Sequence, residues 1–315
     1  MLKGKSLNEH QLIKEYFSNI GSEFLLEKNI STGIGDDAAA YKPPKGYEVI
    51  LSTDTSIEGV HFIKELSPQE IAYRSVAVAL SDLAACGAEP NWFMVSLTMQ
   101  KNDSIWLRNF SLGLEEIAQQ FKIPLIGGDT TKGPLVITVQ VGGIVQNGKM
   151  IRRSGAKKSD LIFVSGNIGN SKLGLKELRK SIPSRKIATR YIRPEPRFDL
   201  LNLLLDSASS AVDISDGLVQ DLQHICNASQ VGAKINIDLI PFSLNISPND
   251  KKRFISEGDD YEICFTIPLD KKDRLRDYIL DKKITEIGSV TKELDFIVEN
   301  NKHEIIKFTK GYSHF

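Results

Sequence analysis

The sequence has few cysteines, no zinc-binding spacing and no excess of either charge. Its three cysteines, Cys86, Cys226 and Cys264, are odd in number and far apart, and no C-x-x-C occurs. This usage predicts a reducing compartment and no zinc site. Lysine plus arginine and aspartate plus glutamate both number 40, so the net charge is +0. No basic field is therefore available for nucleic acid or anionic lipid, and a bound anion must be handled by local groups.

Long apolar runs and two common nucleotide-binding motifs are also missing. No apolar stretch reaches the ~18 residues that span a bilayer. The start, Met-Leu-Lys-Gly-Lys, lacks the apolar region of a signal peptide. We therefore expect a cytoplasmic protein with no membrane partner. Neither G-x-x-x-x-G-K-[ST] nor a kinase-type H-R-D occurs, which argues against P-loop and protein-kinase architectures.

What is present is the composition of a globular protein with two domains. The chain has 315 residues, of which 41% are hydrophobic and 25% charged. A turn signal at Gln146-Asn-Gly-Lys149 predicts a boundary between domains 1–148 and 149–315. Apolar periodicity predicts helices near 7–20, 68–86 and 103–121, and strands that include 47–54, 92–98, 135–141, 160–165 and 263–267.

A glycine turn, Gly33-Ile-Gly-Asp-Asp-Ala-Ala39, carries two adjacent aspartates without a neighbouring lysine or arginine. Adjacent carboxylates repel each other, and a hard divalent cation such as Mg²⁺ would relieve that repulsion. A solvated turn explains the same residues, because glycine and aspartate are common in turns.

Polar residues also end the first long strand and interrupt the helix that follows. Period-two geometry places Ser52 and Asp54 on one face of the strand and Thr53 on the other. Asp82 lies in the last turns of the helix at 68–86, where the helix dipole disfavours a negative charge. A buried carboxylate there needs a partner, which is either Arg74 or a cation.

An apolar strand that ends in an aspartate and hydroxyl residues occurs twice more along the chain. Gly127 and Gly128 precede Asp129, and glycines let backbone amides approach an anion closely. In Ala211-Val-Asp-Ile-Ser-Asp-Gly217, Ser215 or Asp216 can cap the helix that runs to about Ser229. Capping does not explain Asp213, which interrupts an apolar strand.

Arginines and the C-terminal residues add weaker signals. An arginine at position 153 is more often a solvated surface residue, although its guanidinium suits phosphate. The segment with Arg190, Arg193 and Arg197 reads as surface or interface. The aromatic tail at 311–315 is expected to dock back onto the protein.

Taken together, aspartates at turns and element ends predict a site for several divalent cations. The seven are Asp36, Asp37, Asp54, Asp82, Asp129, Asp213 and Asp216. Oxygen ligands and few histidines favour Mg²⁺ over Zn²⁺. Because Mg²⁺ commonly bridges carboxylates to substrate phosphates, the pattern indicates phosphoryl transfer without a Walker motif.

Several of these motifs, in this order, resemble the thiamine-monophosphate kinase family. They are Gly33-Ile-Gly-Asp-Asp-Ala-Ala, Ser52-Thr-Asp-Thr with Gly59-Val-His-Phe62, Ser81-Asp-Leu-Ala-Ala-Cys-Gly-Ala88, Gly127-Gly-Asp-Thr-Thr131, Arg153-Ser-Gly-Ala156, Asp213-Ile-Ser-Asp-Gly217, Gly258-Asp-Asp-Tyr-Glu262 and Gly311-Tyr-Ser-His-Phe315. The resemblance covers nearly the whole chain. Single motifs recur across the wider aminoimidazole-ribonucleotide-synthetase-like superfamily.

The resemblance implies an α/β (α+β) fold of two domains and ATP-dependent phosphorylation of thiamine phosphate to thiamine diphosphate. It implies that domain 1–148 binds nucleotide and Mg²⁺ and dimerises through its sheet into a β-barrel. Domain 149–315 is expected to be α+β. ATP is then the co-substrate, and the protein is expected to be a homodimer.

The resemblance also implies roles for single residues. The expected Mg²⁺ ligands are Asp37, Ser52, Thr53, Asp54, Asp82, Asp129, Asp213 and Asp216. The expected nucleotide contacts are Gly128, Asp129, Arg153 and Ser215, and the expected thiamine-phosphate contacts are His61, Asp259 and Tyr312. The family often has glutamate where Asp259 stands. A core histidine, a turn residue and a packed tail anchor are the structural alternatives for these last three.

The expected mechanism is in-line attack of a thiamine-phosphate oxygen on the γ-phosphorus of ATP. Asp54, Asp129 and Arg153 are the expected catalytic residues. Alternatives are aminoimidazole ribonucleotide synthetase, selenophosphate synthetase, a two-metal phosphohydrolase and a non-catalytic Mg-nucleotide-binding module. Selenophosphate synthetase usually has a cysteine or selenocysteine near its N-terminus, whereas no cysteine here precedes Cys86.

Overall fold

The computed structural model describes residues 8–243, 246–281, 283–309 and 311–313. Backbone contacts divide the chain into two compact units. The first comprises Met1–Leu83 and Ala88–Gly148, and the second comprises Ala84–Gly87 and Lys149–Phe315. Among the described residues, no helix has the length and apolar character needed to cross a bilayer.

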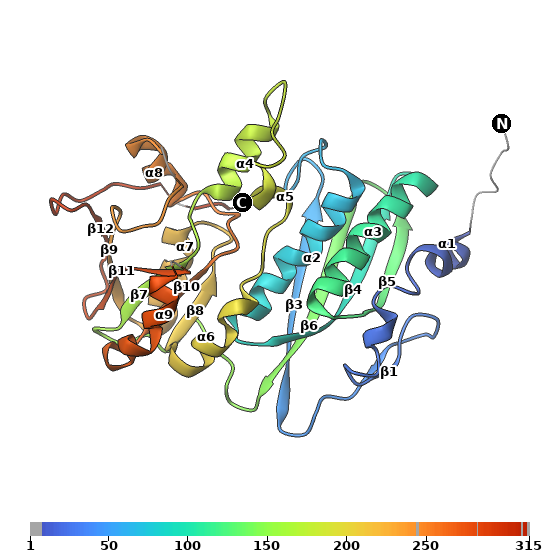
Figure 1. Ribbon diagram of the computed structural model, residues 1–315, viewed down its shortest axis with the longest axis horizontal. Coiled ribbons are helices and arrows are strands. Elements are labelled where there is room, and N and C mark those ends of the chain that lie inside the picture. The colour runs from blue at the N-terminus through green and yellow to red at the C-terminus, as the bar shows by residue number, and fades with distance from the viewer. Residues whose placement is uncertain (1–7, 244–245, 282, 310, 314–315) are drawn as a thin grey trace. The chain divides into compact units, whose positions relative to one another are not determined.

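The first unit is built on a four-stranded sheet of order β3-β6-β4-β5, in which β4 and β5 are parallel and the other pairs antiparallel. Helices α2 and α3 lie side by side along this sheet (Figure 1). The elements of the unit are α1 (Glu9–Tyr16), η1 (Ser22–Phe24), β1 (Ile30–Thr32), β2 (Ala40–Tyr41), β3 (Tyr47–Ile57), α2 (Pro68–Ala85), β4 (Glu89–Met99), α3 (Ser104–Phe121), β5 (Leu125–Lys132) and β6 (Val136–Gln146).

Local sequence signals explain where the two long helices begin and end. Helix α2 starts at Pro68 and is followed by Gly87, which adopts φ +72°. Helix α3 is capped by the Asp103 carboxylate, which accepts the backbone N–H groups of Ile105 and Trp106. The helices approach closely, because a Cβ at Gly113 would lie 2.2 Å from the carbonyl oxygen of Gln69. The helices predicted at 68–86 and 103–121 are thereby confirmed.

The second unit is built on a six-stranded sheet of order β12-β9-β11-β7-β10-β8, in which only the β12–β9 pair is parallel among the described strands. Its elements are β7 (Leu161–Ser165), α4 (Asn170–Leu178), α5 (Thr189–Ile192), η2 (Phe198–Leu200), α6 (Leu201–Ser207), β8 (Ser210–Asp213), α7 (Leu218–Ser229), β9 (Gly232–Asn236), α8 (Pro248–Phe254), β10 (Ile263–Ile267), η3 (Leu269–Leu275), α9 (Arg276–Leu280), β11 (Ile284–Thr291) and β12 (Phe296–Glu299).

Alternating side chains of this sheet pack into two separate apolar clusters. Ile162 and Val164 of β7 join the cluster that contains helix α7, including Leu222. Leu161 and Phe163 of the same strand join the cluster that contains Leu204 of helix α6. The sheet is therefore buried on both faces, which explains why its strands read as continuous apolar runs.

Candidate functional site

A pocket in the first unit lies between the glycine turn and the sheet. Its volume is about 930 Å³, and its lining includes residues 33–39 together with Thr53, Gly128 and Asp129. Asp36 and Asp37 of the turn line the same pocket. The structure thus brings together four predicted site residues, Asp37, Thr53, Gly128 and Asp129, that lie up to 92 positions apart in the sequence.

Backbone geometry explains the glycine before Asp129. Gly128 adopts φ +152°, and a Cβ there would lie 1.9 Å from the carbonyl oxygen of Val95 on the neighbouring strand. No side chain fits at that distance, so β5 can follow β4 only with glycine at this position. The carboxylate of Asp129 accepts the backbone N–H of Thr130 at 2.8 Å through Oδ1.

A second group of predicted residues lies where strand β3 meets helix α2. The hydroxyl of Ser52 donates a hydrogen bond to Oδ2 of Asp82. Burial, together with the charge of Asp82, raises the pKa of the half-buried Asp54 to about 6. Ser52 and Asp54 alternate with the exposed Thr53, as period-two geometry predicts. The partner shown for Asp82 is a serine hydroxyl, and the expected choice between Arg74 and a cation stays a prediction.

His61 lies outside both groups, in the turn that follows β3. Its Nδ1 accepts the backbone N–H of Ile57 at 3.0 Å, so the tautomer with the proton on Nε2 is assigned. The ring is half-buried and is absent from the lining of the large pocket.

In the second unit, strand β8 leads into the turn that carries Ser215 and Asp216. Asp213 is 4% exposed at the end of the strand, where it pairs in register with Ile263. The prediction that Ser215 or Asp216 caps the next helix is wrong. The N-cap residue of α7 is Gly217, with φ +127°, and no side chain caps it.

The group that holds this turn is Asp221, which the sequence reasoning missed. Its Oδ2 accepts the backbone N–H groups of Ser215, Asp216 and Gly217 at 3.1, 3.0 and 3.1 Å. Asp221 is 2% exposed. An aspartate in the first turn of a helix is common. The only signal for this role in the sequence was that Asp221 lies four residues after Gly217.

Opposing influences act on the Asp221 carboxylate. Burial and the charge of Asp216 raise its pKa to about 7. The hydrogen bonds from the backbone N–H groups of Asp216 and Gly217 and the charge of Arg153 act to lower it. Arg153 itself is exposed. The charge of Arg153 therefore acts on Asp221, whose carboxylate holds the turn with Ser215 and Asp216.

The remaining predicted residues of the second unit pack against the same turn. The backbone N–H of Asp259 donates to the carbonyl of Ser215 at 2.7 Å, and the Asp259 carboxylate accepts the Ser171 hydroxyl at 2.8 Å. The backbone N–H of Tyr312 donates to the carbonyl of Asp216 at 3.0 Å, while its side chain is 45% exposed. The predicted docking of the tail is confirmed for Gly311 and Tyr312, and His314 and Phe315 lie outside the described residues.

A buried ion pair in the second unit corrects the expectation that Arg197 lies at the surface. Arg197 is 7% exposed and donates to Glu262 at 2.6 Å, so its reading as a surface residue is wrong. Arg190 also donates to Glu262, at 2.8 Å. Asp260, two residues before Glu262, is also buried. Its carboxylate accepts the Gly169 N–H at the start of α4, and burial raises its pKa to about 8. These partners fix the backbone on both sides of Tyr261.

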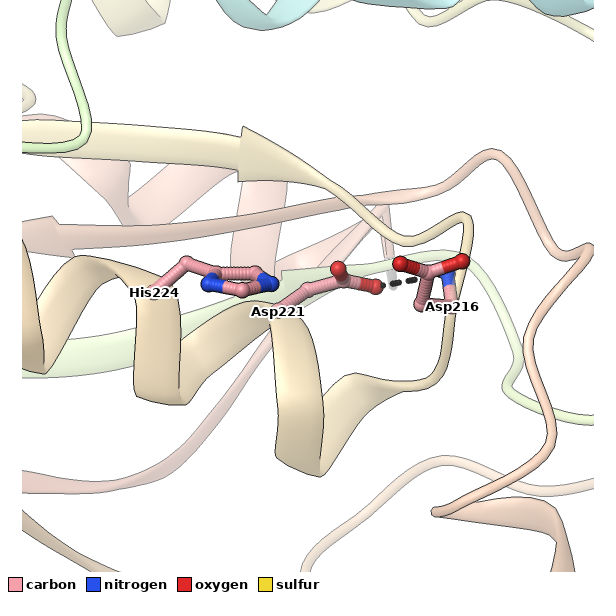
Figure 2. Close-up of side chains that lie close together, drawn as sticks. All are labelled: Asp216, Asp221 and His224. Atoms are coloured by element: carbon pink, nitrogen blue, oxygen red, sulfur yellow. Dashed lines mark hydrogen bonds between the residues drawn. The ribbon is translucent and has the colours of Figure 1, made fainter. Parts of the chain in front are cut away.

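Each unit holds carboxylates that a divalent cation would fit. In the first unit, Asp54 and Asp82 repel each other in a half-buried position, and a cation would remove that cost. In the second unit, ligand atoms of Asp216, Asp221 and His224 all lie within 4.8 Å of one another (Figure 2).

Comparison with known proteins first defines the class. Residues 35–145 match the family described as AIR synthase related protein, N-terminal domain. The thiamine-monophosphate kinase of Buchnera aphidicola subsp. Schizaphis graminum is 41% identical over 98% of this chain and 99% of its own length. The chain therefore belongs to the thiamine-monophosphate kinase family.

Solved structures agree with this assignment. The structure of thiamine-monophosphate kinase from Stenotrophomonas maltophilia K279a has a TM-score of 0.82 and 34% identity, covering 90% of this chain and 97% of its own. A structure described as AaThiL complexed with AMPPCP and TMP has a TM-score of 0.77 and 28% identity, covering 100% of this chain and 99% of its own. The mixed α/β fold expected from the sequence is confirmed at this level.

Proposed function

We propose that this chain transfers the γ-phosphate of ATP to thiamine phosphate, yielding thiamine diphosphate and ADP. The observation that carries the proposal is 41% identity over 98% of the chain to a protein of that name. A relative that was solved with AMPPCP, an ATP analogue, and TMP supports the same pair of substrates.

In the first unit, we assign Mg²⁺ ligation to Asp37, Ser52, Thr53, Asp54, Asp82 and Asp129. The raised pKa of Asp54 supports this, because a carboxylate pressed against another gains most from a bound cation. Gly128 and Asp129 are assigned to the nucleotide, since both line this pocket and glycines let backbone amides approach an anion closely. His61 is assigned to thiamine phosphate.

In the second unit, we assign Asp213 and Asp216 to Mg²⁺, and Arg153 and Ser215 to the nucleotide. Asp259 and Tyr312 are assigned to thiamine phosphate. Support comes from the hydrogen bonds that join the backbones of Asp259 and Tyr312 to the turn 215–216. A carboxylate at position 259 would complement the fixed positive charge of the thiazolium ring.

The chemistry needs positioning more than it needs a base. A phosphate monoester carries about −1.5 to −2 charge at neutral pH, so its oxygen is already a nucleophile. The obstacle to in-line attack is repulsion between two anions. Bound Mg²⁺ would supply the neutralising charge. The chain's own contribution is a permanent positive charge on Arg153 and carboxylates of Asp54 and Asp129 held in place by the sheet.

We further propose that the protein is a cytoplasmic homodimer that associates through the sheet of the first unit. Strand β3 lies at the edge of that sheet and is 11 residues long. Its outward apolar side chains include Leu51, which is 58% exposed, and Tyr47, which is 37% exposed. A long, exposed apolar edge strand is a surface that a second copy would cover.

A single incubation tests the proposed reaction. The protein is incubated with Mg-ATP, with and without thiamine phosphate, and thiamine diphosphate, ADP and free phosphate are measured. We expect thiamine diphosphate and ADP in equal amounts and little free phosphate. Thiamine without its phosphate is the matched control acceptor and should give no product.

Two other results would contradict the proposal. Phosphate release from ATP that is independent of thiamine phosphate would indicate a two-metal phosphohydrolase. Nucleotide binding without turnover would indicate a regulatory module.

A further inference from the structure

Helix α7 and the turn before it bring a nitrogen ligand beside two carboxylates. Asp221 and His224 are three residues apart and therefore share one face of the helix. Asp216 reaches the same place from the turn. One ligand atom of each of the three lies within 4.8 Å of the other two (Figure 2).

Asp221 has a free ligand position despite its burial. Within the described residues, its three hydrogen bonds all go to Oδ2, from the backbone N–H groups of residues 215–217, which leaves Oδ1 for another partner. The side chain belongs to a residue that is 2% exposed. A cation bound to Oδ1 would leave the backbone hydrogen bonds of Oδ2 in place and would offset the burial of the charged carboxylate.

His224 is equally available. Within the part of the chain that the structure describes, its half-buried imidazole has no hydrogen-bond or ion-pair partner. The ring also lines a second pocket of about 400 Å³, together with Gln220, Gln223 and Asn227. That pocket would admit the water molecules that fill the remaining coordination positions of an ion.

We propose that Asp216, Asp221 and His224 form a binding site for a borderline divalent cation such as Zn²⁺ or Co²⁺. Imidazole nitrogen favours such ions, whereas Mg²⁺ prefers oxygen ligands alone. Ligand atoms on one tetrahedral Zn²⁺ lie about 3.4 Å apart, because each bond is about 2.1 Å. The site therefore requires a rotation of the Asp216 and His224 side chains, which are half-buried, to bring the three atoms from within 4.8 Å to that spacing.

This inference goes beyond the proposed function, which assigns Asp216 to Mg²⁺, and it departs from the absence of a zinc site that the cysteine spacing predicts. A tightly held Zn²⁺ would occupy the Asp216 carboxylate and slow the kinase reaction. The site would then make the enzyme sensitive to transition metals through a residue, His224, that the reaction itself does not use. This second consequence rests on the proposed function, whereas the metal binding does not.

The test measures binding of Co²⁺ by its visible absorption, with the full-length protein freed of any histidine tag. We expect one Co²⁺ that Zn²⁺ displaces and excess Mg²⁺ does not. His224→Ala should weaken Co²⁺ binding by about ten-fold or more. His303→Ala is the matched control, because His303 also lies beside a carboxylate, with Nδ1 3.2 Å from Glu299, on the surface of the same unit.

The outcome is decisive in either direction. The site would be overturned if Co²⁺ bound equally well to the wild type and His224→Ala. Equal weakening in His224→Ala and His303→Ala, or displacement of Co²⁺ by Mg²⁺, would also overturn it. If thermal unfolding shows that His224→Ala is not folded, His224→Gln is measured in its place. In a kinase assay at fixed Mg²⁺, Zn²⁺ should inhibit the wild type more than His224→Ala. Failure of that assay alone would leave the binding result standing and would count against the assignment of Asp216 to the reaction.

Discussion

At the scale of single residues, Asp54 shows how a functional carboxylate differs from a structural one. It is half-buried, and burial together with the charge of Asp82 raises its pKa to about 6. Folding gains nothing from that arrangement, since the folded state disfavours the charged form that prevails at neutral pH. Glu262, by contrast, is buried with Arg190 and Arg197 as direct partners. Among the residues that the structure describes, no arginine or lysine forms an ion pair with Asp54, which favours its role as a ligand.

Replacing Asp54 by asparagine should separate activity from stability. We expect kcat/KM for thiamine phosphate to fall by about 10²-fold or more, because a charged ligand is lost where opposing charge must be neutralised. Without Mg²⁺, the melting temperature should stay equal or rise, since the substitution removes a buried repulsion. Asp206→Asn, at the exposed end of α6, is the control and should leave both unchanged. Turnover of Asp54→Asn within a few-fold of wild type at saturating Mg²⁺ would remove Asp54 from the proposed site.

At the scale of elements, the sequence predicts the polar residues at the ends of strands but not the buried carboxylates that hold the following turns. Ser52 and Asp54 could be placed on one face of a strand because alternation in a strand is strict. Asp221 and Asp260 could not be found, because both act across a loop on backbone N–H groups that belong to other residues. Such contacts depend on the path of the chain, which composition and periodicity do not encode. The strands β9, β11 and β12 escaped prediction for a related reason, since their apolar alternation is short and interrupted.

The support of helix α4 by Asp260 gives a prediction for pH. Burial raises the pKa of Asp260 from 3.8 to about 8 in the folded state. Its contribution to stability is therefore full below the unfolded pKa and is lost as the pH rises through the folded pKa. Between pH 6 and 8 we expect the free energy of unfolding to fall by on the order of 1–2 kcal/mol from this group.

Asparagine at position 260 should flatten this pH dependence, because the amide keeps an oxygen that accepts the Gly169 N–H without carrying a charge. Urea unfolding at a series of pH values measures the effect. Asp270→Asn, which changes an exposed carboxylate of the same unit, should retain the wild-type slope. If the free energy of unfolding of Asp260→Asn kept the wild-type dependence on pH between 6 and 8, Asp260 would not titrate in that pH range.

At the scale of the whole molecule, the exposed edge of the first sheet is the feature that a single chain leaves unexplained. Among the described strands, β3 pairs only with β6. Leu51 and Thr53 point away from the buried face of this strand, as the alternating burial of β3 shows. From sequence, these residues read as part of an ordinary buried strand, because periodicity does not reveal which strand lies at an edge. Their exposure therefore became evident only once the strand order was known.

A charge at Leu51 should separate the copies of a dimer formed through this sheet. We expect the wild type to show the mass of two chains by light scattering coupled to size-exclusion chromatography. Leu51→Lys should shift it toward one chain, because a lysine buried at an interface loses hydration without a partner. Leu112→Lys is the matched control, since Leu112 on α3 is 50% exposed compared with 58% for Leu51. A wild type that runs as a monomer, or a Leu51→Lys protein that stays dimeric at low concentration, would exclude association through β3.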